Sequence, residues 1–240
     1  MIVFFNAEIF MNDIKWKPYY HEPGIAIDKN MVHLFKVCID RHYHQIKHIY
    51  QEVLSAKELN KSIRFINSKD RERYIVSKYL LRCILSKFIL TVPALIQFKQ
   101  LANKKPIVDG IEFSVTHSGN YLLLAIGPEA VGIDIEFINK NFDFESLLTA
   151  CFNADECSFI NMGENRLLNF YKLWTRKEAL LKASGEGLTD SLNQFSCLGN
   201  FVTRKQVQYH LNSFTIDDDY IISLAISSTY KGQPNYWNYL

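Results

Sequence analysis

Several motifs that would assign a function directly are missing from this sequence. It has no G-x-x-x-x-G-K-[ST] phosphate loop and no G-x-G-x-x-G fingerprint. It also has no G-x-S-x-G nucleophile motif and no H-E-x-x-H zinc motif. The usual sequence support for an ATPase, a dinucleotide-binding protein, a serine hydrolase or a zinc protease is therefore absent.

Cysteine pairs, a signal sequence and long apolar runs are also lacking. The five cysteines are odd in number and form no C-x-x-C, so neither a disulfide framework nor a zinc ribbon is indicated. The first thirteen residues lack a basic stretch and include Glu8 and Asp13, which is untypical of a signal peptide. Apolar stretches such as 121–126 are too short to span a bilayer. We expect a reduced, cytoplasmic protein that does not enter membranes.

The net charge is small, but the charges are unevenly distributed. The 27 basic and 25 acidic residues leave +2, which argues against a strongly basic nucleic-acid-binding domain and against an acidic tail protein. Residues 1–120 carry 18 basic and 11 acidic side chains, whereas residues 121–240 carry 9 and 14. That asymmetry suits an anionic ligand beside one half and a cation in the other, although on charge alone chance and solvated surface are the better explanation. A length of 240 residues allows one large domain or two smaller ones.

The region 55–89 predicts two helices with a basic surface. Ser55 and Glu58 have the spacing of a capping box at a helix start. From Asp70 to residue 89, apolar residues recur at three- and four-residue steps, as in an amphipathic helix. A basic stripe follows that helix, formed by Arg71, Lys78 and Arg82. It is either a solvated face or a surface that meets an anion.

The region 113–137 predicts three strands, and the last of them carries two acids. Residues 113–126 indicate two strands around a Ser-Gly-Asn turn. Residues 131–137 alternate, which places Asp134 and Glu136 on one face, about 7 Å apart. Two such carboxylates repel each other unless a cation or a basic group lies between them. An ordinary solvent-exposed face is the alternative.

A second strong helix is predicted over 165–184. Trp174, Glu178 and Lys182 follow each other at four-residue steps and therefore share one stripe. Gly185 and Gly187 end the helix. By itself a Glu–Lys pair at this spacing commonly supports only a surface helix. The segments 121–126 and 220–226 resemble each other, which suggests two similar α+β halves.

Three carboxylates are thus available for one site: Asp134, Glu136 and Glu178. Carboxylate oxygens are what Mg²⁺ prefers, with water and substrate phosphates completing its coordination. Lysines nearby, around residues 61–82 and at Lys104 and Lys105, suit a diphosphate substrate. The residues alone therefore indicate a Mg²⁺-dependent enzyme that acts on a phosphate ester.

Three blocks give the chain a family resemblance. They are FSVTHSGNYLLLAI (113–126), VGIDIE (131–136) and FYKLWTRKEALLKASGEGL (170–188). In this order they resemble the 4′-phosphopantetheinyl transferases of the larger, surfactin-synthetase-activating (Sfp) type. The resemblance implies a pseudo-dimer of two similar α+β halves, 1–120 and 121–240, that forms its active cleft as a monomer. It extends more weakly over about 55–196 and says little about 1–50.

The resemblance also implies a reaction and a set of roles. The phosphopantetheine arm of coenzyme A would pass to a serine of an apo acyl or peptidyl carrier protein, which releases adenosine 3′,5′-bisphosphate. Asp134, Glu136 and Glu178 would hold Mg²⁺ or Mn²⁺. Glu156 would be the general base for the serine, and Lys182 would neutralise and protonate the departing phosphate. The expected coenzyme A contacts are Lys61, Lys105, Thr116, His117 and Lys182.

Two departures from the family pattern affect the coenzyme A contacts. Lys104 stands where the family often has Gly, and Thr116 stands where serine is common.

His42, His44 and His48 have no acidic or cysteine partner at a metal-site spacing, so we expect a polar surface there. The sequence does not specify whether a fatty-acid, polyketide or nonribosomal-peptide carrier is served.

Two other functions compete with this interpretation. One is another Mg²⁺-dependent phosphotransferase or nucleotide hydrolase, which would use the same carboxylates. The other is a binding protein whose basic helix at 70–89 contacts RNA or an acidic partner, with salt-sensitive affinity. The binding protein leaves Asp134, Glu136 and Glu178 without a role.

Overall fold

The computed structural model describes residues 14–20, 27–100, 105–187 and 191–240. Lys104 and the N-terminal segment that we expect to lack a signal sequence (1–13) lie outside these described residues, as does Leu188 of the third family block. The chain folds into two compact units. We name them the α3 unit (16–113, 120–128 and 232–240) and the α6 unit (14–15, 114–119 and 129–231), and each is described by itself.

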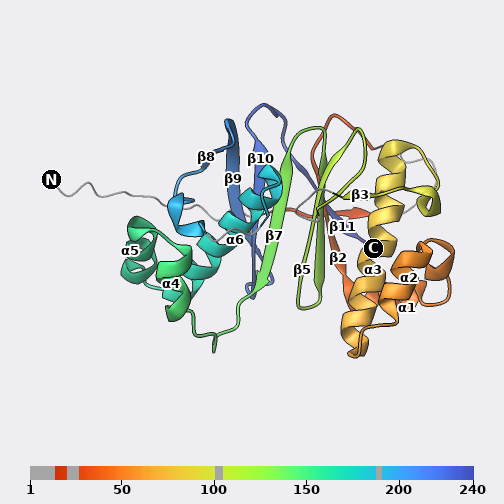
Figure 1. The fold of residues 1–240 in the computed structure, drawn as a ribbon, viewed down its shortest axis with the longest axis horizontal. Coiled ribbons are helices and arrows are strands. Elements are labelled where there is room, and N and C mark those ends of the chain that lie inside the picture. Colours follow the sequence, from red (N-terminus) through yellow and green to blue (C-terminus); the bar gives the residue numbers. More distant parts are fainter. Residues whose placement is uncertain (1–13, 21–26, 101–104, 188–190) are drawn as a thin grey trace. The chain divides into compact units, whose positions relative to one another are not determined.

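Most of the N-terminal part of the chain lies in the α3 unit (Figure 1). Its helices are α1 (Ile39–Ile46), α2 (Ala56–Ser62) and α3 (Ser68–Ile89), with 3₁₀ turns η1 (Tyr50–Glu52) and η2 (Pro93–Leu95). Its strands are β1 (Lys17–Tyr19), β2 (His33–Cys38), β3 (Lys99–Gln100), β4 (Pro106–Ile107), β6 (Tyr121–Gly127) and β11 (Asn235–Tyr239). Strand β5 (Glu112–Ser118) begins in this unit and continues into the other.

The two helices predicted in this unit are confirmed. Ser55 caps α2 through the expected capping box, because its hydroxyl accepts from the backbone N–H of Glu58 and the Glu58 carboxylate accepts from Ser55. Helix α3 begins after Asn67, whose side chain accepts from Lys69 N–H, and it covers the predicted amphipathic stretch. Helices α1 and α2 lie beside α3 (Figure 1).

A five-stranded sheet has the order β1-β11-β2-β6-β5, with the C-terminal strand β11 parallel to β1 and β2. Aromatic side chains of its strands pack against one another: the ring of Tyr19 contacts those of Phe35 and Trp237. The expected polar surface is wrong for His42, which is buried against Tyr239, while His44 and His48 are exposed. The apolar spacing of α1 turns His42 inward.

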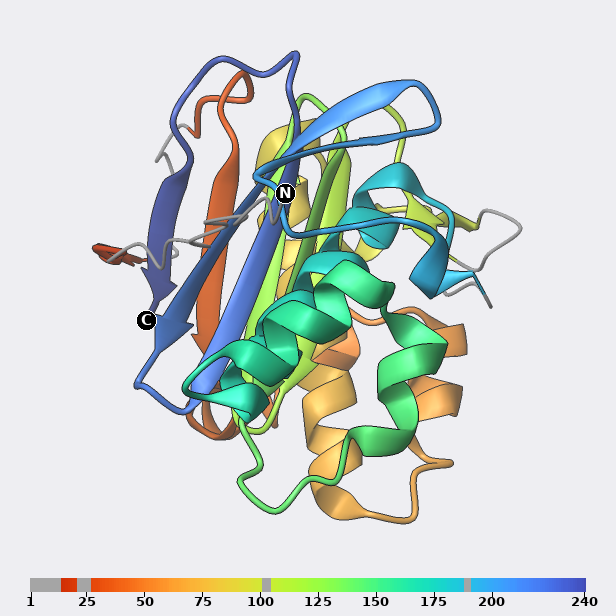
Figure 2. The ribbon, with the colours of Figure 1, turned by 90° about the vertical axis from the view of Figure 1, so that its left-hand side faces the viewer.

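The α6 unit holds the rest of the predicted elements. Its helices are α4 (Glu145–Cys151), α5 (Ala154–Met162) and α6 (Arg166–Ser184), with the 3₁₀ turn η3 (Leu192–Gln194). Its strands are β7 (Val131–Phe137), β8 (Phe201–Arg204), β9 (Val207–Ile216) and β10 (Tyr220–Ser227), in the antiparallel order β7-β10-β9-β8. Helix α6 lies across one face of this sheet, with α5 beside it (Figure 2). Gly185 ends α6 in the left-handed conformation, as predicted.

Strand β7 and helix α6 approach each other closely because residue 132 is glycine. A Cβ on Gly132 would lie 2.0 Å from the carbonyl oxygen of Ala179 and 2.4 Å from the backbone nitrogen of Ala183. No side chain fits in that space, so glycine allows the backbone of α6 to lie directly on β7. This contact sets the distance between the two elements that carry the predicted carboxylates.

The mixed α+β fold class is confirmed. The chain passes between the units near residues 15, 113, 119, 128 and 231, so each unit contains several chain segments, whereas we expected two continuous halves, 1–120 and 121–240. No helix in the described part of the chain combines the length and the hydrophobicity that a bilayer span requires.

Candidate active site

A row of hydroxyl groups on β5 faces the acidic strand β7 within the α6 unit. Ser114, Thr116 and Ser118 alternate along β5, so their side chains point to the same side. The Thr116 hydroxyl donates to Oδ1 of Asp134 at 3.0 Å, and the Ser118 hydroxyl donates to Oε2 of Glu136 at 3.1 Å. The Ser114 hydroxyl accepts from the backbone N–H that precedes Asp134, at 3.1 Å. This row holds both carboxylates in defined orientations. The pattern Ser-x-Thr-x-Ser is visible in the sequence, but its role depends on the neighbouring strand and was not predicted.

Helix α6 brings Trp174, Glu178 and Lys182 to the same carboxylates. The ammonium group of Lys182 lies 2.6 Å from Oδ1 of Asp134, across the Gly132 contact. The indole of Trp174 hydrogen-bonds Glu136. The predicted stripe on α6 therefore faces the predicted pair on β7, so the solvent-exposed alternative does not describe Asp134, which is buried.

The electrostatics of this cluster are those of crowded carboxylates. Burial, together with the negative charges of Asp134 and Glu136, raises the pKa of Glu178 to about 7, against the opposing charge of Lys182. Burial also raises the pKa of Glu136, and Asp134 adds to the effect. The pKa of Asp134 is raised by burial despite its pairing with Lys182. Additional positive charge would stabilise all three ionised groups.

The cluster fits a divalent cation on one observation in particular. Oδ2 of Asp134 is buried and has no hydrogen-bond partner. A buried carboxylate oxygen ordinarily has a partner, and a hard cation such as Mg²⁺ supplies one. In the described residues no three potential ligands are already gathered in metal-binding geometry. In the structure, Thr116 and Lys182 both contact Oδ1 of Asp134, and Ser118 contacts Oε2 of Glu136.

Glu156 lies apart from this cluster and is fully buried. Its Oε2 accepts from the backbone N–H of Asn153 and pairs with Lys177 at 2.8 Å, and its Oε1 accepts from the backbone N–H of Cys197 at 2.8 Å. A general base must come within hydrogen-bond distance of the hydroxyl that it deprotonates. The position of Glu156 therefore argues against the expected role as base for a carrier serine.

The expected coenzyme A contacts fall in both units. Thr116 and the exposed His117 are on β5 in the α6 unit, and Thr116 directs its hydroxyl to Asp134. Lys61 and Lys105 are in the α3 unit. The ammonium group of Lys105 lies 3.5 Å from the carboxylate of Glu112.

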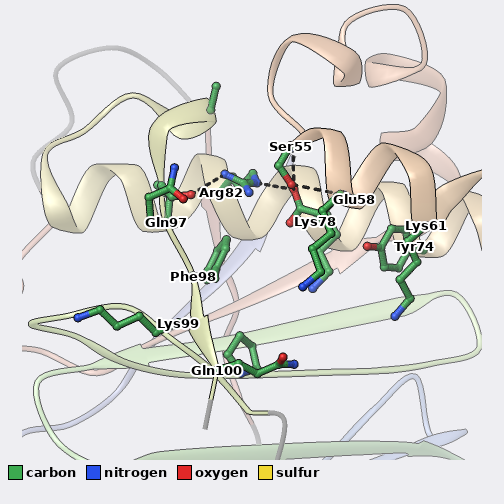
Figure 3. Close-up of a pocket in the computed structure, with 14 residues that line it drawn as sticks. Ser55, Glu58, Lys61, Tyr74, Lys78, Arg82, Gln97, Phe98, Lys99 and Gln100 are labelled. Atoms are coloured by element: carbon green, nitrogen blue, oxygen red, sulfur yellow. Dashed lines mark hydrogen bonds and ion pairs between the residues drawn. The ribbon is translucent and has the colours of Figure 1, made fainter.

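Lys61 lines a pocket of about 380 Å³ in the α3 unit (Figure 3). Figure 3 shows the amino groups of Lys61 and Lys78 pointing the same way, next to Tyr74. Both ammonium groups lie over the Tyr74 ring, 5.2 and 5.7 Å from its centroid. Burial lowers the pKa of Lys78, and the charges of Lys61 and Arg82 lower it further against the opposing Glu58. A pocket with this lining favours an anionic ligand.

The basic stripe predicted on α3 divides into separate roles. Lys78 lines the pocket, whereas Arg82 is buried and donates to Glu58 at 2.8 Å. The other end of Arg82 donates to the carbonyl oxygens of Pro93 and Ile96. Arg82 thus joins α2, α3 and the segment after α3 into the pocket wall. A continuous solvated stripe for RNA is inconsistent with this burial.

Comparison with known proteins places the chain in a family. The model described as 4′-phosphopantetheinyl transferase, N-terminal, matches residues 41–129, and the model of the 4′-phosphopantetheinyl transferase superfamily matches residues 130–225. The slr0495 protein of Synechocystis is 30% identical over 196 residues, which cover 78% of each chain. This chain belongs to the 4′-phosphopantetheinyl transferase superfamily. The two adjoining matches fit the expected construction from two halves.

Other members of the superfamily are similar over different lengths. The 4′-phosphopantetheinyl transferase HetI of Nostoc is 27% identical over 237 residues, which cover 93% of this chain and 98% of HetI. The 4′-phosphopantetheinyl transferase gsp of Aneurinibacillus migulanus is 30% identical and covers 65% of each chain. Membership makes the chain an enzyme of the transferase class.

Proposed function

We propose that this transferase moves the 4′-phosphopantetheine arm of coenzyme A to a serine of an apo acyl or peptidyl carrier protein. The serine oxygen would attack the phosphorus next to the pantetheine arm, and the hydroxyl proton would pass to water. The bond to the adenosine phosphate would break, which releases adenosine 3′,5′-bisphosphate. Membership of the superfamily supports the reaction, and the site in the α6 unit supports the chemistry.

The cation would be held by Asp134, Glu136 and Glu178. The observation that carries this assignment is the buried, unpartnered Oδ2 of Asp134 beside two carboxylates with raised pKa values. When bound, a divalent cation disperses the negative charge of a diphosphate as it reacts. Mg²⁺ suits such oxygen ligands, and Mn²⁺ is the alternative.

Lys182 would neutralise and protonate the departing phosphate. Its side chain is about one-third exposed and already approaches Asp134 at 2.6 Å, so its ammonium group lies at the edge of the carboxylate cluster. The hydroxyls of Thr116 and Ser118 would orient the carboxylates. His117 and Lys105 remain proposed contacts for the coenzyme A phosphates.

The pocket with Lys61 and Lys78 would hold an anionic part of coenzyme A. The pair of lysines over Tyr74 supports this assignment. From the sequence we also predict that the enzyme is a monomer of the Sfp subtype, with two functional halves, 1–120 and 121–240. We predict that it acts in the reduced cytoplasm. The carrier would belong to a fatty-acid, polyketide or nonribosomal-peptide system.

Mass spectrometry tests this function directly. The protein is incubated with coenzyme A, Mg²⁺ and a panel of apo-carriers, and each carrier is weighed intact. At least one carrier should gain about 340 Da, the mass of one phosphopantetheine arm. Hydrolysis of coenzyme A without any carrier adduct would instead favour the rival phosphotransferase or hydrolase.

A further inference from the structure

A second buried charged cluster joins α5 to α6, outside the proposed metal site. Glu156, Arg176 and Lys177 are each no more than 1% exposed. Arg176 and Lys177 directly precede Glu178 in the chain. We call these three residues the buried node. Three fully buried charges are costly to maintain unless each is paired and hydrogen-bonded.

Lys177 has an acceptor for each of its three ammonium hydrogens, one in Glu156 and two in the segment that follows α6. Its ammonium group lies 2.8 Å from Oε2 of Glu156, and it donates to the carbonyl oxygens of Leu192 at 2.8 Å and Phe195 at 2.6 Å. The ring of Phe195 lies 4.3 Å from the same ammonium group. Lys177 therefore connects residues 192–195, which follow α6 in the chain, to α6 by hydrogen bonds.

Arg176 also holds the segment that follows α6 to the helix, at residues 197–200. It donates to the carbonyl oxygens of Cys197 at 2.7 Å and Gly199 at 2.6 Å. It also donates to the side chains of Asn200 and Ser213, each at 3.3 Å. Most of the segment 192–200 lacks regular structure, so these charged side chains supply hydrogen bonds that strands or helices would otherwise provide.

Glu156 connects this arrangement to α5. It closes the capping box at the start of α5 with Asn153, accepts from Cys197 and pairs with Lys177. One carboxylate thus joins the start of α5, the segment 192–197 and the middle of α6. Neither of its oxygens faces solvent, so it has no direct route to a carrier serine.

We propose that Glu156 is a positioning residue, which acts on the metal site through Lys177 and α6. Lys177 and Glu178 are consecutive in one helix, so a rotation or shift of α6 at Lys177 displaces Glu178 relative to Asp134. The close contact at Gly132 leaves α6 little space to shift, because even an added Cβ at position 132 would collide with the α6 backbone. The inference rests on the proposed metal site and adds the residues that hold its helix.

Replacement of Glu156 by Gln separates positioning from proton transfer. Binding of Mn²⁺ is measured by electron paramagnetic resonance without coenzyme A, at a temperature where circular dichroism shows the variant folded. We expect Mn²⁺ affinity to fall about tenfold or more, as for residues that orient metal ligands. At saturating cation, kcat should stay within a few-fold of the wild type.

Two results would overturn the inference. A general base predicts unchanged Mn²⁺ affinity and a loss of kcat of about 100-fold or more at saturating cation. A residue needed only for stability predicts a lower Tm, with Mn²⁺ affinity and kcat of the folded variant both unchanged. If wild-type protein itself bound no Mn²⁺ and modified no carrier, the proposed function would fail instead.

A second variant keeps the test decisive if Glu156→Gln does not fold. Lys177→Arg preserves the cation and its pairing with Glu156, but a guanidinium cannot reproduce the geometry of the ammonium contacts to Leu192 and Phe195. It should weaken Mn²⁺ binding, and unchanged binding would contradict the inference. Glu145→Gln is the matched control, because Glu145 forms an exposed pair with Arg166 of α6, and it should change neither quantity.

Discussion

Gly132 of β7 lies directly against Ala179 of α6, so that a Cβ at position 132 would be 2.0 Å from the Ala179 carbonyl oxygen. Two residues further along β7 is Asp134, and one turn further along α6 is Lys182, which pair at 2.6 Å. Because Gly132 has no side chain, the cluster residues on β7 and those on α6 can approach each other closely. The close approach of α6 explains why the G-I-D-I-E block begins with glycine, and the neighbouring residues in the sequence do not indicate this.

Gly132→Ala should damage both stability and cation binding. The added methyl group meets helix backbone, which cannot turn aside as a flexible side chain can. We expect a loss of about 1–3 kcal/mol in the free energy of unfolding, measured by urea titration, together with weaker Mn²⁺ binding. Gly199→Ala is the control, because its nearest atom would be at an ordinary 3.6 Å. Equal behaviour of the two variants would contradict the close-contact account.

Thr116→Val tests whether the hydroxyl on β5 supports Asp134. Valine has nearly the same shape but cannot donate, so the buried Asp134 loses one partner. Hydrogen bonds to charged groups contribute about 1.5–3 kcal/mol, and we expect a destabilisation in that range by urea titration. Thr116→Ser retains the hydroxyl and should stay close to wild type. If Thr116→Val altered only the KM for coenzyme A, its hydroxyl would act on the substrate and not on Asp134.

Lys78→Ala and Lys61→Ala test the anion pocket of the α3 unit. Each removes one positive charge from the pocket wall, so steady-state kinetics should show a KM for coenzyme A raised about tenfold with kcat little changed. Lys69→Ala, at the exposed start of α3, is the control and should leave KM unaltered. A pocket unrelated to coenzyme A would show the same KM in all three variants.

His42 should make the protein less stable in mild acid. Burial lowers the pKa of His42 below its ordinary 6.5, against an opposing hydrogen bond to the Cys38 carbonyl oxygen. The unfolded chain then binds more protons than the folded protein below pH 6.5, so the free energy of unfolding falls as the pH drops below that value. Above pH 6.5 the free energy of unfolding is fully retained.

Urea titrations over a range of pH values check this expectation. His42→Asn removes the titrating ring and should flatten the pH dependence. His44→Asn, on the exposed side of the same helix, should leave the slope of the wild type. Identical slopes for all three proteins would show that the buried ring is not the source.

Local chemistry made much of this fold predictable. The Ser55 capping box, the alternation in 131–137 and the glycine after α6 each depend on neighbours within a few residues. The same is true of the stripe on α6. Elements of this kind can be read from periodicity because a helix or strand fixes which side chains share a face.

Contacts between distant segments were less accessible. The row of hydroxyls on β5 meets β7 only after both strands are placed, and the burial of Glu156 depends on Lys177 and on the segment 192–197. Glu156 has the residue type that a general base requires, so sequence alone could not separate that role from a buried ion pair. The inward position of His42 depended on the packing of α1 in the same way.

The central claim is that Asp134, Glu136 and Glu178 hold the cation that the transfer requires. The most direct measurement is the intact mass of an apo-carrier after incubation with coenzyme A, Mg²⁺ and either wild-type protein or folded Asp134→Ala or Glu178→Ala. We expect a gain of about 340 Da with the wild type and no gain with either variant, since each variant lacks one cation ligand. Normal modification of the carrier by either variant would contradict it.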